Sequence, residues 1–137
     1  MTVVFKIAGE PVGKARPRYT FKTGRAYTPK KTKDYERHVA ESYKEHGGYW
    51  FGDDPISVEI TAYFKLPKSA SKKKKAELMA GYPAKKPDVD NICKIILDGL
   101  QGTAFRDDKN VWSTSIKKFW CKADEDGCVV VCISDGK

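Results

Sequence analysis

Hydrophobic and polar positions alternate most clearly between residues 56 and 66 of this chain. Single, mostly polar residues separate the apolar positions Ile56, Val58, Ile60, Ala62, Phe64 and Leu66. A period of two predicts a strand with one face on the core, which Pro67 then ends. Residues 2–8, 111–122 and 128–133 are also rich in apolar residues and predict strands. We expect the last two strands to pair as an antiparallel hairpin around a turn at 124–127.

Three other segments have a helical pattern. Thr32 is the expected N-cap of a helix that runs to about Glu45 and stops at Gly47 and Gly48. Residues 69–79 predict a short helix with four consecutive lysines, which is typical of a solvated face. Residues 90–101 predict the second long helix, apolar on one side. Residues 16–21 could form a paired strand or an irregular segment, and we expect a loop tip at residues 22–25.

The order of these elements predicts a single compact α+β domain over residues 1–137. We expect a mixed or antiparallel sheet with two main helices packed on it. A length of 137 residues suits one domain. No apolar run approaches the roughly 18 residues that span a bilayer, and no signal peptide is recognised. The sequence therefore predicts a cytoplasmic protein without a membrane partner.

The charge of the chain is strongly basic and unevenly distributed. A formal net charge of +8 favours nucleic acid or another anionic surface as the partner. Between residues 14 and 33 the chain has no acid, and its three aromatic residues there, Tyr19, Phe21 and Tyr27, can stack on exposed bases. Alternate residues of an extended stretch share one face. The candidate DNA contacts are Lys14, Arg16, Arg18, Lys85 and Lys86.

One segment of this basic chain is rich in acids. Between residues 86 and 108 lie Asp88, Asp90, Lys94, Asp98, Asp107 and Asp108. At about 100° per residue, Asp90, Lys94 and Asp98 form a stripe opposite the apolar side of the helix. Asp107 and Asp108 join them if the strand that follows lies beside that helix.

Structural roles explain each of these residues singly. An aspartate caps a helix start, Asp90 and Lys94 make an ordinary i,i+4 pair, and Asp107 and Asp108 suit a polar turn. Together, however, five crowded acids repel one another and favour a bound cation. Carboxylates, phosphate and water are the ligands of Mg²⁺. The pattern indicates metal-assisted phosphodiester hydrolysis, in which a lysine offsets the charge that develops on phosphorus.

At these residues the chain resembles the RusA family of Holliday-junction resolvases of bacteria and phages. The similarity rests on Lys86-Pro87-Asp88-Val89-Asp90-Asn91-Ile92-Cys93-Lys94, then Asp98-Gly99-Leu100 and Asp107-Asp108, with a similar opening from Gly9 to Arg18. Gly99, where family members often carry alanine, is a departure that we expect to matter little.

The resemblance implies a RusA-like fold and a Mg²⁺-dependent endonuclease, with Mn²⁺ tolerated, that acts in DNA recombination and repair. The enzyme would bind four-way junctions as a homodimer and nick two strands symmetrically. The metal ligands would be Asp88, Asp90 and Asp108, and the essential lysine Lys94. Asp98 and Asp107 would be secondary acids. A prophage origin fits the family.

Two other functions stay open from the sequence. One is a DNA-binding protein without catalysis, which the five acids and Lys94 argue against, because carboxylates facing phosphate weaken pure binding. The other is a metal-dependent nuclease on other branched DNA or on RNA.

Overall fold

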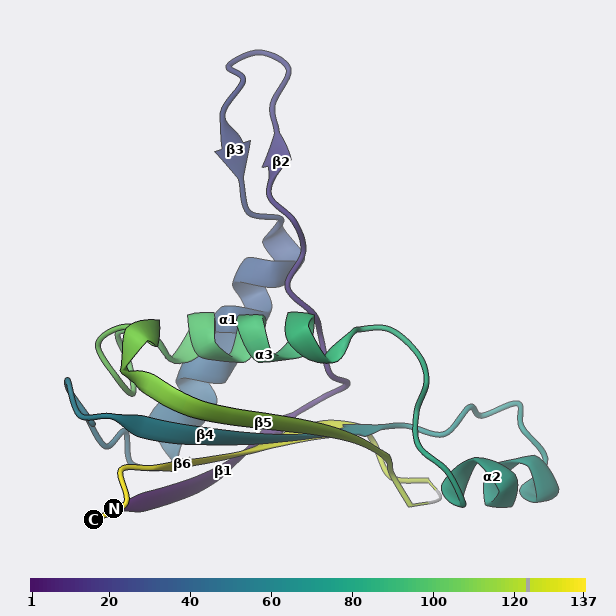
Figure 1. Ribbon diagram of the computed structural model, residues 1–137. Helices are drawn as coiled ribbons and strands as arrows, with labels where there is room; N and C mark the ends of the chain where they lie inside the picture. Colours follow the sequence, from purple (N-terminus) through teal and green to yellow (C-terminus); the bar gives the residue numbers. More distant parts are fainter. Residues whose placement is uncertain (123) are drawn as a thin grey trace.

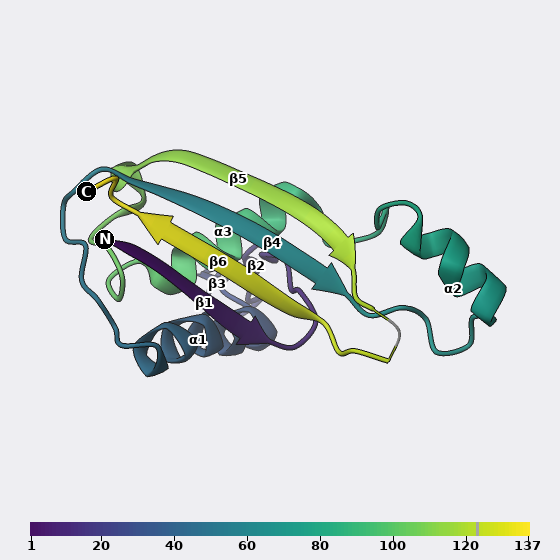
Figure 2. The ribbon, with the colours of Figure 1, turned by 90° about the horizontal axis from the view of Figure 1, so that it is seen from below.

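The main sheet of the protein has four strands, and both long helices lie on one of its faces (Figure 1). The computed structural model describes residues 1–122 and 124–137. Figure 2 shows the opposite face of the sheet with no described element in front of it. The predicted α+β class, with two helices packed on a mixed sheet, is confirmed.

The elements are β1 (Thr2–Ala8), β2 (Arg18–Tyr19), β3 (Ala26–Tyr27), α1 (Lys30–Glu45), β4 (Ile56–Phe64), α2 (Lys72–Met79), α3 (Val89–Leu100), η1 (Asp108–Asn110), β5 (Val111–Trp120) and β6 (Cys128–Ser134).

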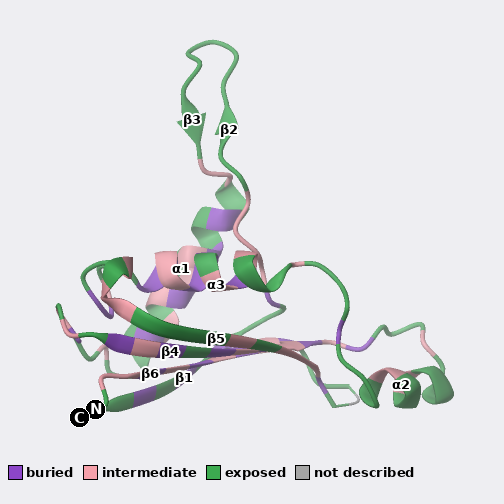
Figure 3. Ribbon diagram, viewed as in Figure 1, coloured by how far each residue is buried: buried purple, intermediate pink, exposed green. Residues whose placement is uncertain are grey.

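β4 confirms the strand that the alternating pattern predicts. Its side chains alternate between the core and the open face, as a half-buried strand requires. The inward positions, all at most 1% exposed, are Ile56, Val58, Ile60, Ala62 and Phe64. Buried residues gather between the sheet and the two helices, whereas α2 and the β2–β3 hairpin are exposed (Figure 3). The core therefore lies on one face of the sheet.

The predicted hairpin between residues 111–122 and 128–133 is wrong. The strand order is β1-β6-β4-β5, so β5 pairs with β4 in parallel and β6 lies on the other side of β4. Burial explains the order. β6 buries Val129, Val131 and Ile133 completely and takes a central place, whereas β5 is exposed from residue 112 to 115 and takes an edge. Because parallel strands need a crossover, α3 lies in the connection between β4 and β5.

The helices lie close to their predicted ranges. α1 begins at Lys30, with Pro29 at the N-cap position, so the expected cap Thr32 is instead a buried residue of the first turn. The amide groups of Gly47 and Gly48 bond back to the last turn of α1, as predicted for its end. α2 has Ser71 as its N-cap and buries none of its side chains, which confirms a solvated lysine-rich helix. Among the described residues, every helix is too short or too polar to span a bilayer.

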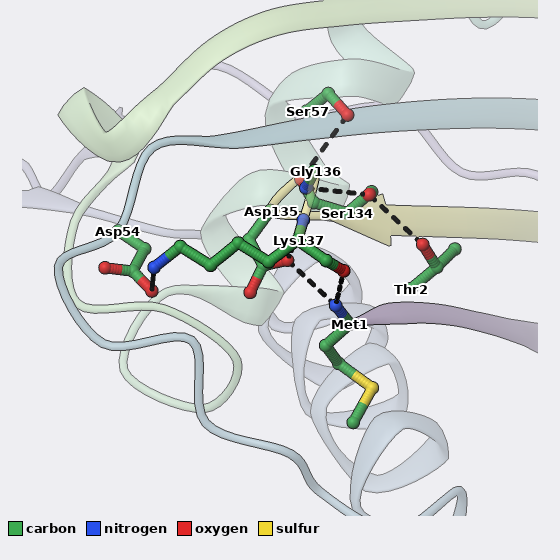
Figure 4. A network of polar contacts seen from close by, with 8 residues as sticks. All are labelled: Met1, Thr2, Asp54, Ser57, Ser134, Asp135, Gly136 and Lys137. Carbon is green, nitrogen blue, oxygen red and sulfur yellow. Dashed lines mark hydrogen bonds and ion pairs between the residues drawn. The ribbon is translucent and has the colours of Figure 1, made fainter.

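The two ends of the chain meet where the start of β1 lies beside the end of β6. The amino group of Met1 donates to the Asp135 carboxylate at 2.9 Å and to the carbonyl oxygen of Lys137 at 2.6 Å (Figure 4). The Lys137 side chain reaches Asp54 at 3.3 Å. Antiparallel pairing of β1 with β6 places these ends side by side.

α1 and α3 cross closely at Gly99. A Cβ atom at this position would lie 2.8 Å from Cβ of Val39 and 2.9 Å from the carbonyl oxygen of Glu36. Both distances are shorter than carbon contacts allow, and one neighbour is backbone. We expected glycine at position 99, where relatives often have alanine, to matter little. For the packing of α1 against α3 this expectation is wrong.

We expect Gly99→Ala to lower the free energy of unfolding by about 1 kcal/mol. Overpacking costs about 1 to 3 kcal/mol, which exceeds the roughly 1 kcal/mol that alanine gains over glycine in a helix. Thermal unfolding should show a melting temperature a few degrees lower. The matched control is Gly81→Ala, where the nearest atom to an added Cβ is 3.9 Å away and no loss is expected. A melting temperature at or above that of the wild type would contradict the tight crossing.

Candidate active site

The first turn of α3 carries two of the predicted acids on exposed positions. Asp88 occupies the N-cap position, yet its side chain makes no capping hydrogen bond. Asp90 follows within the first turn. The positive end of the helix dipole favours negative charge here. Among the described residues neither carboxylate takes part in an ion pair, so both remain available to a ligand.

Lys94 bridges two acids that are distant in sequence. Its ammonium group lies 3.0 Å from Oδ1 of Asp98 and 3.4 Å from Oδ2 of Asp108. The predicted return of Asp108 to the neighbourhood of α3 is thus confirmed. The hydrogen bond to Asp98 is the largest cause that raises the pKa of Lys94 above the ordinary 10.5. Lys94 is therefore a fixed cation at neutral pH and is unsuited to act as a general base.

The turn before β5 holds Asp108 in place. The Asp107 carboxylate accepts a hydrogen bond from the amide of Lys109 at 3.2 Å, and the Asn110 side-chain oxygen accepts one from the amide of Asp107 at 3.0 Å. Asn110 also donates to the carbonyl oxygen of Asp53 at 3.0 Å. Asp107 thus caps η1, and this cap orients its neighbour Asp108.

One oxygen of Asp108 has an unusual environment. Oδ1 is buried without a hydrogen-bond partner among the described residues, whereas Oδ2 accepts from Lys94. A buried acceptor of this kind needs an explanation, and a bound cation supplies one. In the described part of the chain, no three His, Cys, Asp or Glu side chains form a group of metal-binding size. Asp108 pairs with Lys94, whose position on α3 is one helical turn, about 6 Å along the helix axis, after Asp90.

Lys14 has a different environment from the one its candidate role in DNA binding suggests. Its ammonium group lies 2.5 Å from Oε1 of Glu36 and 3.0 Å from Oδ2 of Asp98. Partial burial acts to lower the pKa of Lys14, but the bonds to these two carboxylates outweigh it and the pKa is raised. Its amide donates to the carbonyl oxygen of Asn91 at 2.9 Å. Lys14 therefore ties the N-terminal segment to α3.

Glu36 is a site residue that the sequence reasoning missed. It lies on α1 next to the stripe of buried side chains that includes Thr32, Tyr35 and Val39. A carboxylate four residues after Thr32 and three before Val39 borders the buried side of the helix and needs a cationic partner. This spacing in the sequence could have identified Glu36 as a residue with a cationic partner.

A cavity of about 490 Å³ adjoins the start of α3. Asp88 lines it together with the cations Lys14, Arg18, Lys31 and Lys86. Lys31 was not among the predicted DNA contacts. Cations around one carboxylate make this cavity suitable for a phosphate group.

The other two predicted DNA contacts lie outside the lining of that cavity. Arg16 is exposed on the segment before β2. The Lys85 ammonium lies 5.7 Å from the centre of the Phe64 ring, and the carbonyl oxygen of Lys85 accepts a bond from Lys118 at 2.5 Å. Lys85 therefore contacts the end of β4.

α3 and its neighbours carry carboxylate oxygens, a fixed ammonium group and, at the start of the helix, a basic cavity. Carboxylates of this kind suit a hard divalent cation, which takes one or two of them along with phosphate and water oxygens. The ammonium group can stabilise negative charge that develops on a substrate. These are the requirements of phosphoryl chemistry.

Comparison with known proteins identifies the family. The chain matches the family model described as "Endodeoxyribonuclease RusA" over residues 8–132. It is also 34% identical over 124 residues to "Uncharacterized protein YqaN" of Bacillus subtilis (strain 168), which covers 86% of this chain and 87% of the relative. Because the family match takes in nearly the whole chain and the acidic face of α3, this protein belongs to the RusA family of endodeoxyribonucleases.

Proposed function

We propose that the protein is a Mg²⁺-dependent endonuclease that resolves four-way DNA junctions by paired, symmetric nicks. The observation that carries the proposal is the buried oxygen of Asp108, which has no hydrogen-bond partner among the described residues and lies next to the Lys94 ammonium. The first turn of α3 adds two exposed acids. Family membership supports nuclease chemistry. A net charge of +8 supports a polyanionic substrate.

Asp88, Asp90 and Asp108 are the residues that would hold the metal ion. A bound Mg²⁺ polarises a phosphoryl oxygen and lowers the pKa of a bound water. Mg²⁺ commonly keeps several waters and takes only one or two carboxylates, so a closed cage of protein ligands is not required. Lys94, held by Asp98, places its charge where the phosphorus gains negative charge. The cavity beside Asp88 binds a phosphate of the same strand through Arg18, Lys31 and Lys86.

The proposed substrate also determines the proposed assembly. A four-way junction has paired strands of like polarity, and two symmetric nicks need two active sites. We therefore include a homodimer in the proposal, along with a role in DNA recombination and repair inside the cell. A prophage source is consistent with the same role.

One assay tests the whole proposal. The protein is incubated with a labelled four-way junction, a linear duplex and a single strand of matching sequence, with Mg²⁺ or with EDTA. We expect paired nicks in the junction alone, and only with Mg²⁺. A three-way branched DNA in the same assay separates a broader nuclease, which would cleave it at the same rate. Junction binding without cleavage would favour a binding protein.

We expect Asp88→Asn, Asp90→Asn and Asp108→Asn each to abolish nearly all cleavage while junction binding survives. Each variant loses a metal ligand, and the removal of negative charge beside phosphate leaves affinity unchanged or higher. Gel-shift affinity with EDTA and cleavage with Mg²⁺ are measured on the same preparations. The matched control is Asp34→Asn, an exposed acid of α1 that pairs with its neighbour Arg37. Normal cleavage by all three site variants would refute the assignment.

Lys94→Ala should lower the cleavage rate about a hundred- to a thousandfold at nearly unchanged junction affinity. A merely structural ion pair would instead cost a few tenths of a kcal/mol in stability and leave cleavage normal. Lys94→Arg, which keeps the charge, should recover part of the rate. Because the pKa of Lys94 is raised above 10.5, the dependence of the wild-type rate on this residue should persist through mildly alkaline pH. Rates and melting temperatures of both variants separate the two roles.

We expect Arg18→Ala to weaken DNA binding and Lys14→Ala to lower the stability of the fold. Arg18 is exposed in the basic cavity, so its loss should weaken DNA binding and reduce the slope of log affinity against log salt by about one unit. Lys14 neutralises Glu36 and Asp98, so its loss should lower the free energy of unfolding by about 1 to 2 kcal/mol. Equal melting temperatures for the two variants would argue against the internal role of Lys14.

A further inference from the structure

The hairpin of residues 18–27, hereafter the arm, projects away from the sheet and the long helices (Figure 1). β2 and β3 pair with each other in a separate two-stranded sheet. The amide of Thr20 donates to the carbonyl oxygen of Arg25 at 3.1 Å, and the amide of Gly24 donates to that of Thr20 at 2.9 Å. Gly24 has a φ of 65°, which closes the tight tip. Every residue of the arm is exposed.

The arm presents aromatic rings to solvent. Phe21 at the tip is fully exposed, with a relative exposure of 109%, and Tyr19 is 70% exposed. These rings make no contribution to the core, and a two-stranded hairpin alone is marginally stable. Isolated exposed apolar residues are common, but two flat rings on a projecting arm form a suitable surface for stacking.

Charge identifies the class of partner. The arm itself carries Arg18, Lys22 and Arg25, and no acid occurs between residues 14 and 33. Cations beside exposed aromatic rings are the combination that binds single-stranded or unstacked nucleic acid, with the cations on phosphates and the rings on bases. An apolar protein partner would not require this uniform positive charge.

The root of the arm is part of the candidate site. Arg18 lines the cavity that also contains Asp88. Phe21 lies three residue steps after Arg18, a reach of at most about 10 Å at about 3.3 Å per extended residue. This reach corresponds to about three nucleotide steps at about 3.4 Å per step. The tip of the arm can therefore reach a base within about three nucleotide steps of a phosphate held at the cavity.

We infer that Phe21 stacks on an open base face at the exchange point of a branched DNA, and that the arm thereby selects junctions over linear duplex. In a continuous duplex both faces of every base are covered by neighbours, so stacking would require a step to be pried apart. At an exchange point the terminal pairs have a face that can open at lower cost. The inference rests on the proposed function and specifies which element distinguishes the substrate.

The test compares equilibrium binding of Phe21→Ala and wild type to a four-way junction and to a linear duplex, with EDTA present so that cleavage plays no part. We expect Phe21→Ala to bind the junction about five- to a hundredfold more weakly, with duplex affinity unchanged. Phe21→Trp should retain the preference. Tyr82→Ala, which removes a 75%-exposed aromatic residue outside the arm, should leave both affinities unchanged. Lys22→Ala should reduce the salt slope on both DNAs.

A second readout locates the contact. 2-Aminopurine, whose fluorescence responds to stacking, is placed at the exchange point or in the middle of a duplex arm. Wild type and Phe21→Trp should change the signal only at the exchange point, and Phe21→Ala should lose most of that change. An unchanged junction-to-duplex ratio for Phe21→Ala, or an equal loss on both DNAs, overturns the inference. A wild type without any junction preference in binding also overturns the inference. Failure of the proposed function is a separate result, seen as the absence of Mg²⁺-dependent junction cleavage.

Discussion

The close crossing of α1 and α3 is the contact on which the site depends. Because Gly99 has no side chain, the two helices approach until the backbone of Glu36 touches α3. The carboxylate of Glu36 then faces the Lys14 ammonium group. From there carboxylates and ammonium groups alternate, through Asp98 and Lys94 to Asp108. A wider crossing would separate the first two members of this series.

This alternation explains how several acids coexist in one small region. Each of the two lysines lies between two carboxylates, so repulsion within the series is offset inside the protein. The acids at the start of α3 lie outside the series and have no such partner among the described residues. The helix dipole favours their negative charge, and cations line the cavity beside Asp88. The protein thus separates charges that maintain its own structure from charges that face outward.

Local patterns in the sequence predicted elements well and their pairing less well. The alternation of β4 and the apolar stripe of α3 come from burial on one side, which a period of two or 3.6 reveals directly. The pairing of β5 with β4 depends on which strand can tolerate an edge, and this is a competition among all four strands. The polar run Ser113-Thr114-Ser115 carried that information, but proximity in sequence favoured the hairpin.

In the site, too, local relations between residues could be predicted better than contacts between separate elements. Asp88, Asp90, Lys94 and Asp98 could be placed relative to one another because they share one helix, and the approach of Asp108 followed from a strand beside it. The commitment of Lys14 to an internal ion pair could not be predicted, because it requires the position of α1. In an unfolded chain, Lys14 is one of several equivalent cations. Only the folded structure separates it from exposed neighbours such as Arg16.

The meeting of Met1 with the C-terminal residues makes the chain nearly a closed ring. β1 and β6 are neighbours in the sheet, so a short linker between the two ends would follow the existing path of the backbone. New ends could then be opened in the exposed loop of residues 20–25 without cutting any strand of the main sheet. Such a permuted chain would keep the sheet and both long helices but divide the arm into two free strands. The connectivity of the fold would then allow the scaffold to be studied apart from the intact arm.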